Sequence, residues 1–189
     1  DRMTEGLEKW HGLESRVGAW PEGKRVALTI RDDLGHLNLR GDPEDTEFLR
    51  AAEQVLGLAL PVEPNTMAEG YITIFWLGPD EWLILLPADA VSEIAGALES
   101  ALQRRHFALN DVSGGQISIT LRGSRVRELL AKGCTLDLHA KVFSRGLCAQ
   151  SGLAKASVLI GLIGDDDEFI LVVRRSFSDY LIKWLTNAV

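Results

Sequence analysis

The sequence predicts an α+β fold built from two related halves, residues 24–106 and 107–189, and three observations support this prediction. The triplet Leu-Arg-Gly occurs at residues 39–41 and again at 121–123, an offset of 82. Each triplet ends a strand-like run and precedes a helix-like run. Each half then continues with two apolar runs and an amphipathic segment. A fixed offset between similar segments indicates an internal duplication.

Each half opens with two strands joined by a turn that contains glycine. The predicted strands cover residues 26–30 and 36–39 in the first half, and residues 108–112 and 117–121 in the second. In the last of these, Ile117, Ile119 and Leu121 alternate with polar residues, which is the period of a half-buried strand. Glycine and aspartate in the connecting segments are typical of tight turns.

A helix is expected after each pair of strands. In the first half it covers residues 43–57, with Asp42 as the N-cap and Pro43 in the first helical position. Its apolar stripe consists of Phe48, Leu49, Ala52, Val55 and Leu56. The counterpart covers residues 124–132 and ends at Gly133, because glycine favours helix termination. Its inward-facing residues are Val126, Leu129 and Leu130.

Two further strands and a closing helix complete each half. The strands cover residues 72–77 and 82–86, then 158–163 and 169–173. They are almost entirely apolar, so we expect both faces of each strand to be buried. The closing helices carry apolar stripes at Val91, Ile94, Ala95, Leu98 and Leu102, and at Phe177, Tyr180, Leu181, Trp184 and Leu185. Ser176 and Asp179 resemble a capping box at the start of the last helix.

Counted from the second strand of each half, the order becomes βαββαβ, which is the ferredoxin-like order. The strand at 108–112 then completes the first unit, and the strand at 26–30 completes the second. We therefore predict one domain, residues 24–189, in which two ferredoxin-like units exchange a strand about a pseudo-twofold axis. Residues 1–23 fall outside the repeat and are interpreted as an N-terminal arm, and residues 134–157 as an irregular insertion.

Composition limits the possible partners and compartments. The 189 residues carry a net charge of -7, and basic residues occur in runs no longer than two. Nucleic acids and anionic membranes require clustered lysine and arginine, so neither is an expected partner. The apolar runs are too short to span a bilayer, and the N-terminus lacks the apolar core of a signal peptide. Two cysteines favour a reducing compartment, so we expect a cytoplasmic protein.

Motifs of catalysis and cofactor binding are absent from the sequence. The glycine-rich nucleotide loops, the GxSxG elbow, the HExxH zinc motif and the CxxC pair are all missing. We therefore expect no catalytic, cofactor-binding or metal-binding residue in this chain. A metal site formed by Cys134, His139 and Cys148 is the alternative to buried thiols and a hydrogen-bonded histidine, but a structural zinc site needs four ligands.

Three segments allow a ligand site as the less favoured of two interpretations. The acidic turn at residues 165–168 is interpreted as a hairpin tip rather than a calcium loop. Residues 113–115, Ser-Gly-Gly, are interpreted as a hairpin turn rather than an anion-binding nest. Arg174 and Arg175 precede a helix start, where a phosphate or carboxylate can bind. An exposed pair, or a salt bridge to a partner subunit, is the favoured interpretation.

The five tryptophans divide into two groups. Trp76, Trp82 and Trp184 lie in apolar runs and are expected in the core. Trp10 and Trp20 lie in the N-terminal arm, and aromatic residues in irregular arms are common anchors at protein interfaces. We therefore assign a partner interface to Trp10, Trp20, Arg174 and Arg175.

Several motifs, in their order along the chain, resemble one protein family. They are Pro64-Asn65-Thr66, the run WLGPDEWL from Trp76 to Leu83, Asp111-Val112-Ser113, the run LLAKGC from Leu129 to Cys134 with Asp137-Leu138-His139, Phe143 with Gly146, and the run VRRSF from Val173 to Phe177. Together they resemble the gamma subunit of heterotetrameric sarcosine oxidase over roughly residues 55–187. Ala140 is a small departure, since the family is expected to have proline there.

The resemblance implies a non-catalytic subunit of an oxidoreductase complex, with alpha, beta and delta subunits as partners. That complex oxidises sarcosine and passes electrons through flavins to oxygen. The resemblance places FAD, FMN, NAD, tetrahydrofolate and zinc in the other subunits, and none of them in this chain. It also implies docking on the alpha subunit, and a fold similar to the folate-binding domain of the glycine cleavage T protein.

Two other functions remain open at this point. A stand-alone folate-dependent, aminomethyltransferase-like one-carbon protein is compatible with the fold, although such enzymes are longer. A regulatory sensor of small molecules is compatible with paired ferredoxin-like units, by analogy of fold alone. The partners recovered with the chain, and titration with tetrahydrofolate or amino acids, distinguish these functions.

Overall fold

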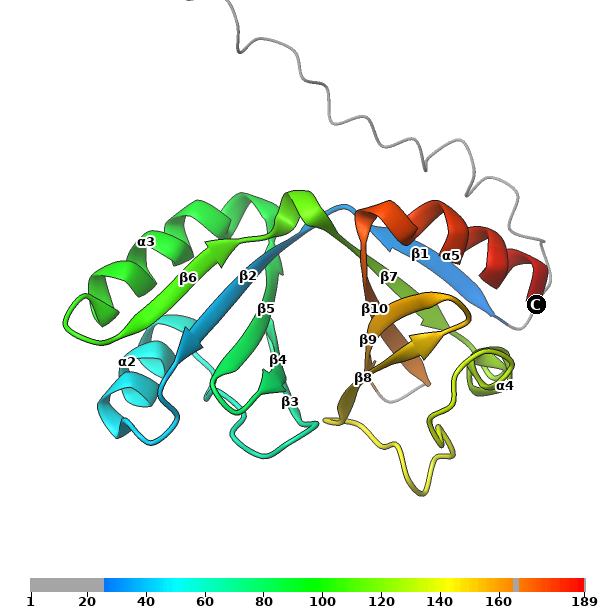
Figure 1. Cartoon of the computed structure of the whole chain (residues 1–189), viewed down its shortest axis with the longest axis horizontal. Helices are drawn as coiled ribbons and strands as arrows, with labels where there is room; N and C mark the ends of the chain where they lie inside the picture. The colour runs from blue at the N-terminus through cyan, green and yellow to red at the C-terminus, as the bar shows by residue number, and fades with distance from the viewer. Residues whose placement is uncertain (1–25, 165–166, 189) are drawn as a thin grey trace, which may run out of the picture.

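The computed structural model describes residues 26–164 and 167–188, which form two antiparallel sheets of five strands each (Figure 1). The first sheet has the strand order β3-β4-β5-β2-β6, and the second has the order β1-β7-β10-β9-β8. The strands of the first sheet are β2 (Leu34–Gly41), β3 (Met67–Glu69), β4 (Thr73–Gly78), β5 (Glu81–Pro87) and β6 (Phe107–Asp111). Those of the second sheet are β1 (Ala27–Arg31), β7 (Gln116–Arg122), β8 (Cys148–Leu153), β9 (Ala156–Ile163) and β10 (Glu168–Arg174).

Helices cover the outer faces of both sheets. Helices α2 (Thr46–Leu56) and α3 (Val91–Leu102) lie against the first sheet, and α4 (Val126–Ala131) and α5 (Arg175–Ala188) lie against the second (Figure 1). Each helix–sheet space is filled by its own apolar cluster. In the part of the chain that the structure describes, no helix is both long and apolar enough to cross a membrane.

A third apolar cluster lies between the two sheets. Its buried members are Met67, Phe75, Leu83, Leu85, Cys148, Leu159, Ile170 and Val172. Strands β5, β9 and β10 contribute alternate residues to this cluster and to a helix-covered cluster. The prediction that both faces of these strands are buried is therefore confirmed.

Each sheet contains one strand from the other half of the chain. Strand β6 pairs with β2, with Leu109 opposite Leu39, and strand β1 pairs with β7, with Leu28 opposite Leu121. The predicted exchange of these two strands is confirmed. Strands β1 and β2 are joined by a two-residue turn, and β6 and β7 by the 3₁₀ turn η2 (Ser113–Gly115). The chain therefore passes between the sheets at two points, both visible at the top of Figure 1.

Helix α2 begins three residues later than predicted. Its N-cap is Asp45, whose Oδ1 accepts hydrogen bonds from the backbone N–H groups of Glu47 and Phe48 at 3.0 and 3.1 Å. The prediction that Asp42 caps a helix with Pro43 in its first position is wrong, because the Asp42 carboxylate closes a preceding turn. The predicted apolar stripe is confirmed, with Phe48, Ala52 and Leu56 buried.

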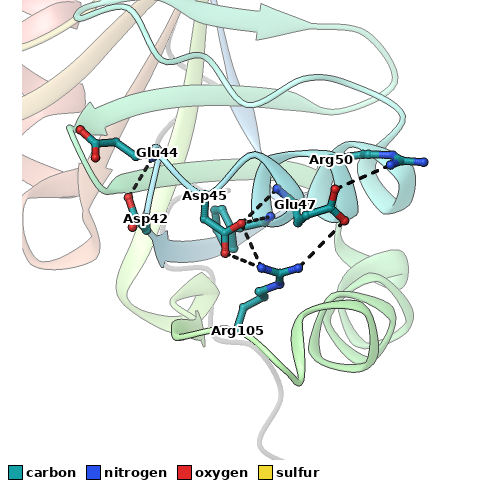
Figure 2. Close-up of polar contacts among 7 residues, drawn as sticks. Asp42, Glu44, Asp45, Glu47, Arg50 and Arg105 are labelled. Atoms are coloured by element: carbon teal, nitrogen blue, oxygen red, sulfur yellow. Dashed lines mark hydrogen bonds and ion pairs between the residues drawn. The ribbon is translucent and has the colours of Figure 1, made fainter.

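Arg105, which follows α3, contacts the start of α2 (Figure 2). Its Nη1 lies 2.9 Å from Asp45 Oδ2, and its Nη2 lies 4.0 Å from Glu47 Oε2. Desolvation opposes ionisation of Asp45, but the Phe48 N–H and the charge of Arg105 outweigh it and lower the pKa of Asp45. The two helices that cover the first sheet are thereby joined at their ends.

Helix α4 ends for a different reason from the one predicted. It stops at Ala131 with Lys132 as the C-cap, and Gly133 does not have the left-handed conformation of a glycine helix stop. Position 133 requires glycine because a side chain has no room there: a Cβ would lie 2.5 Å from the Trp184 ring. The predicted inward-facing residues are confirmed as buried: Val126, Leu129 and Leu130.

Helix α5 follows β10 directly, so the predicted capping box is wrong. The helix begins one residue before Ser176, which places both Ser176 and Asp179 inside it. Phe177 was expected on the apolar stripe but is 41% exposed, whereas Ile182 is buried. The buried residues of the helix are Ser178, Leu181, Ile182 and Leu185, so its apolar face is rotated relative to the prediction.

The strands β3 and β8, which were not predicted, connect the edges of the two sheets. The N–H of Met67 donates to the carbonyl of Gly146 at 2.9 Å, and the N–H of Cys148 donates to the carbonyl of Asn65 at 2.8 Å. The segment 134–157, expected to be an irregular insertion, therefore contains the whole of the edge strand β8. The sheets are hydrogen-bonded at this end and joined by the crossing chain at the other.

Candidate functional site

A cavity of about 520 Å³ lies where the chain passes between the sheets, and we call it the crossover cavity. Its wall is formed by the β1–β2 turn, the start of α3, the end of β6, η2, the start of β7 and the first residue of α5. Polar side chains of the wall include Arg31, His36, Asp111, Ser113, Gln116 and Arg175. Pockets of this size accept small molecules.

The turn η2 in this wall is fixed by its own side chains. Oδ1 of Asp111 accepts hydrogen bonds from the N–H and the hydroxyl of Ser113, at 2.9 and 2.5 Å. The Ser113 hydroxyl oxygen in turn accepts the N–H of His36 at 2.9 Å. The hairpin interpretation of residues 113–115 is wrong, because this turn connects strands of different sheets. The Ser113 N–H is already bonded to Asp111, which disfavours an anion nest.

His36 is a buried polar residue that the sequence analysis missed. It is 2% exposed, and its Nε2 lies 2.8 Å from Oγ of Ser118, while its Nδ1 has no partner among the described residues. Burial lowers the pKa of His36 to about 4, an effect opposed by Asp111 and supported by Arg175. Ser118 is fully buried, so the neutral histidine and the hydroxyl form a buried hydrogen-bonded pair.

Arg174 and Arg175 line two different pockets. Arg175 lines the crossover cavity, and its Nε donates to the carbonyl of Gly114 at 2.9 Å. Arg174 lines a second space of about 520 Å³ between the sheets, which we call the sheet cleft. Both side chains belong to exposed residues, and no ion pair to Arg174 is found within residues 26–164 and 167–188. Their predicted role at a partner interface stays a prediction.

Gln116 lies between the two pockets and was also missed from the sequence. It lines both the crossover cavity and the sheet cleft. Its Oε1 is buried and has no hydrogen-bond partner within the described part of the chain. An unpaired buried acceptor costs about 1–3 kcal/mol.

The three residues of the alternative metal site do not come together. Cys134 packs in the helix-covered cluster of the second sheet, Cys148 lies between the sheets, and His139 is exposed. Among residues 26–164 and 167–188, no group of three potential metal ligands is found. Both cysteines are free thiols, and burial raises the pKa of Cys148 to about 12. The buried-thiol interpretation is therefore confirmed.

The acidic turn at 165–168 contributes to an ion pair rather than to a described cation site. Asp165 and Asp166 lie outside the described residues. Asp167 Oδ1 lies 2.7 Å from Nε of Arg127, whose guanidinium also stacks 5.1 Å from the centre of the Phe169 ring. Arg127 additionally donates to the carbonyls of Leu138 and Phe143. This arginine therefore holds the long loop before β8 against the β9–β10 hairpin.

The tryptophans agree in part with their predicted positions. Trp82 is fully buried, and its Nε1 donates to the carbonyl of Pro61 at 2.7 Å. Trp76 and Trp184 are half-buried. Trp10 and Trp20 lie outside the described residues, so their predicted interface role stays a prediction.

Comparison of whole folds defines the class of protein. The structure is similar to the glycine cleavage system aminomethyltransferase T from Bartonella henselae, with a TM-score of 0.65 and 14% identity over 85% of this chain and 45% of that chain. A weaker likeness, with a TM-score of 0.51 and 12% identity over 87% of this chain and 97% of the other, links it to the regulatory subunit of aspartate kinase from Thermus thermophilus. The chain is an α+β protein whose fold is similar to that of the aminomethyltransferase T protein.

The chain belongs to the sarcosine oxidase gamma subunit family, which it matches over residues 40–189. It is 33% identical to the sarcosine oxidase subunit gamma of Corynebacterium sp. strain P-1 over 156 residues, covering 81% of this chain and 74% of the relative. It is 30% identical to that of strain U-96 over 197 residues, covering 100% and 94%. A chain of heterotetrameric sarcosine oxidase from Corynebacterium sp. U-96 matches with a TM-score of 0.84 and 26% identity, covering 94% and 91%. The resemblance stated from the sequence motifs is confirmed.

Proposed function

We propose that the chain is a non-catalytic subunit of a heterotetrameric sarcosine oxidase, which docks on the alpha subunit and supports assembly of the complex. The similarity to a chain of heterotetrameric sarcosine oxidase, with a TM-score of 0.84, carries this proposal. The partners are the alpha, beta and delta subunits, in the cytoplasm. These subunits hold the FAD, FMN, NAD, tetrahydrofolate and zinc of the complex.

The chemistry of the buried polar groups supports a non-catalytic role. The Ser118 hydroxyl is fully buried, and the pKa of its partner His36 is lowered to about 4. The raised pKa of Cys148, about 12, keeps this thiol protonated at neutral pH. Nucleophilic catalysis requires an accessible nucleophile with an activating base, and none of these three groups meets that requirement.

The proposed docking surface includes Arg174 and Arg175, together with Trp10 and Trp20 of the N-terminal arm. Arg174 is exposed beside the sheet cleft and has no ion pair within the described ranges. Such an arginine supports a partner contact, because arginine binds carboxylates at protein interfaces through a rigid, planar guanidinium group.

We further infer that residues 24–189 form one domain that arose by duplication of a ferredoxin-like unit. The units β2-α2-β4-β5-α3-β6 and β7-α4-β9-β10-α5-β1 have the same spatial order of strands. His36 is hydrogen-bonded to Ser118, and Thr66 to Cys148, and each pair is separated by the repeat offset of 82. Residues related by a twofold rotation meet near its axis, so these contacts support a pseudo-twofold.

The assembly role is tested by co-expressing alpha, beta and delta subunits with and without this chain. Gel filtration is expected to show an incomplete or unstable complex when the chain is omitted, and sarcosine oxidation is expected to fall with it. An intact and fully active complex of the other three subunits contradicts the proposal. Recovery of the chain alone from its native cells, with tight tetrahydrofolate binding, favours the stand-alone one-carbon protein instead.

The proposed surface is tested with a matched pair of charge reversals. Arg174→Glu is expected to weaken assembly, because it places a repulsive charge on the docking surface. Arg104→Glu is the control, since Arg104 is also exposed but lies after α3, beside the first sheet. If the two substitutions change the gel-filtration profile equally, Arg174 is not part of the interface.

The arm is tested by deleting residues 1–23. Assembly is expected to weaken, while the unfolding temperature of the isolated chain stays nearly unchanged. A large loss of stability in the isolated chain assigns these residues to the core instead of to a docking arm.

A further inference from the structure

Charge is divided unevenly between the two halves of the chain. Residues 24–106 contain 14 acidic and 7 basic residues, whereas residues 107–189 contain 8 acidic and 10 basic residues. The net charge is therefore -7 in the first half and +2 in the second. Because surface charge steers association and selects partners, the second half is the part of the chain that attracts an acidic partner.

Helix α5 of the second half carries aromatic residues on a side that the sheet does not fully cover. Phe177, Tyr180 and Trp184 are spaced by three and four residues, so they lie along one side of the helix. Phe177 is 41% exposed, and the other two rings are half-buried. This aromatic side lies next to the face that packs on the sheet, and exposed aromatic residues are common anchors at protein interfaces.

Two lysines lie beside these rings. The N–H of Lys155 donates to the hydroxyl oxygen of Tyr180 at 3.2 Å, which places the β8–β9 turn next to the aromatic side. Lys183 follows Tyr180 by three residues and is its neighbour on the helix surface. Both lysines are exposed, and neither makes an ion pair within residues 26–164 and 167–188. The α5 surface, as we call it, consists of Lys155, Phe177, Tyr180, Lys183 and Trp184.

The chemistry of the α5 surface defines its partner. Lysines pair with carboxylates, and partly exposed rings bury apolar side chains. Asp179, the acidic residue of α5, is two residues from Phe177 and points to a different side of the helix. A nucleic acid is disfavoured, because the net charge of -7 repels phosphates. The matching partner is a protein segment that carries carboxylates together with an apolar side chain.

We propose that the α5 surface binds an acidic segment of the partner subunit on which the chain docks. The carboxylates of the segment pair with Lys155 and Lys183, and its apolar side chain packs against Phe177. This inference rests on the proposed function and names the chemistry of that docking. The surface continues the proposed docking surface, because Arg174 precedes Phe177 by three residues. Helix α5 covers the outer face of the second sheet (Figure 1), so the acidic first half lies away from the contact.

The first test measures how much alpha subunit is recovered on the tagged chain after co-expression of all four subunits. Lys155→Glu and Lys183→Glu are each expected to reduce the recovery by about fivefold to tenfold, because they place a negative charge opposite carboxylates. Phe177→Ser is expected to reduce it by about tenfold. The matched controls are Lys141→Glu and Val142→Ser, which change an exposed lysine and an exposed apolar residue in the loop between α4 and β8.

Two further measurements keep the test independent of misfolding. Unfolding temperatures of the isolated variants are expected to stay near that of the wild type, because the substituted side chains are exposed. Raising the salt concentration from about 50 mM to about 500 mM screens surface charges. It is therefore expected to weaken recovery by the wild type more than recovery by Lys155→Glu.

The second test identifies what covers the α5 surface. The photo-cross-linker p-benzoylphenylalanine at position 177 of the assembled complex is expected to label a partner segment rich in aspartate and glutamate. The same cross-linker at position 142 is the control and is expected to miss that segment. Mass spectrometry of the cross-linked peptides identifies the labelled residues.

The proposal is overturned if both lysine variants recover as much alpha subunit as the wild type does. It is also overturned if the cross-linker at position 177 labels a second copy of this chain or a segment without acidic residues. These outcomes leave the assembly role intact, because the wild type still recovers its partners. If the wild type recovers no partner, the proposed function fails, and the inference that rests on it fails too.

Discussion

Nε2 of His36 and Oγ of Ser118 lie 2.8 Å apart, which joins the two sheets by a buried hydrogen bond. His36 belongs to β2 of the first sheet, and Ser118 belongs to β7 of the second. Both residues are buried, at 2% and 0% exposure, beside an otherwise apolar cluster. Protonation of His36 therefore places a charge between the two sheets.

The stability of the chain is expected to depend on the protonation of His36. Burial lowers the pKa of His36 from 6.5 to about 4, although Asp111 opposes the shift, while Arg175 adds to it. The unfolded state therefore binds the proton first, and stability falls as the pH drops from about 6.5 toward about 4. A shift of this size corresponds to about 3 kcal/mol in the free energy of unfolding.

The measurement is chemical denaturation between pH 4 and 7, comparing the wild type with His36→Gln. The variant is expected to lose less stability on acidification than the wild type. His106→Gln is the control, because His106 is exposed, and it is expected to follow the wild-type curve. Parallel curves for wild type and His36→Gln contradict the prediction.

Arg127→Ala is expected to loosen the loop before β8 and to destabilise the chain by about 2–3 kcal/mol, the usual cost of losing partly buried charged hydrogen bonds. The Arg127 side chain is 18% exposed and contacts Asp167 together with two loop carbonyls. Hydrogen exchange of the Val142 and Phe143 amides is expected to become faster. Arg125→Ala is the control, since its pair with Glu128 is exposed and contributes less than about 1 kcal/mol. Similar effects of the two substitutions refute the role of Arg127.

Gly161→Ala is expected to destabilise the packing between the sheets by about 1–3 kcal/mol, as overpacking of a core does. A Cβ at Gly161 would lie 2.5 Å from the Phe75 ring and 2.8 Å from Met67 Sδ, and both residues belong to the cluster between the sheets. Gly152→Ala on the adjacent strand β8 is the control, because nothing lies within 4 Å of its added Cβ. Equal unfolding temperatures for the two variants contradict this prediction, because they show that the packing between the sheets adjusts to the added methyl group.

Cys148 is expected to be unreactive toward iodoacetamide in the folded chain. Burial raises the pKa of its thiol to about 12, so at pH 8 only about one molecule in ten thousand carries the reactive thiolate. The same residue is expected to react rapidly in concentrated urea, which serves as the control. Mass spectrometry of the peptides measures the labelling, and fast labelling of Cys148 without denaturant contradicts its buried position.

The exchange of strands was predictable because Leu-Arg-Gly occurs twice at a fixed offset, each time between a strand-like and a helix-like run. The start of α2 was not predictable in the same way, because Asp42 and Asp45 are both favourable N-caps and only their hydrogen bonds decide between them. Strand β3 was missed because it has only three residues, and β8 because polar residues and glycine interrupt its apolar residues. Their position is fixed by backbone hydrogen bonds to distant segments, which leave no pattern in the local sequence.

The arginine pair was identified from the sequence, but His36 and Gln116 were not. A single polar residue within a strand has no motif, and its burial depends on the packing of the opposite sheet. One signal was available for His36, because it is separated from Ser118 by the same 82 residues as the repeated triplets. Residues separated by this offset are therefore candidates for contact across the proposed pseudo-twofold axis.

The exchange of β1 and β6 also sets an order on folding during translation. Residues 27–31 leave the ribosome before the first sheet, and their partner strand β7 is synthesised only after that sheet is complete. Strand β1 therefore stays unpaired while residues 32–115 are synthesised, and an unpaired strand edge can associate with other chains. A chain that ends at residue 106 lacks β6, so its first sheet is incomplete, and it also lacks the second sheet, with which β1 pairs. A nascent chain released at the boundary between the halves therefore completes neither sheet.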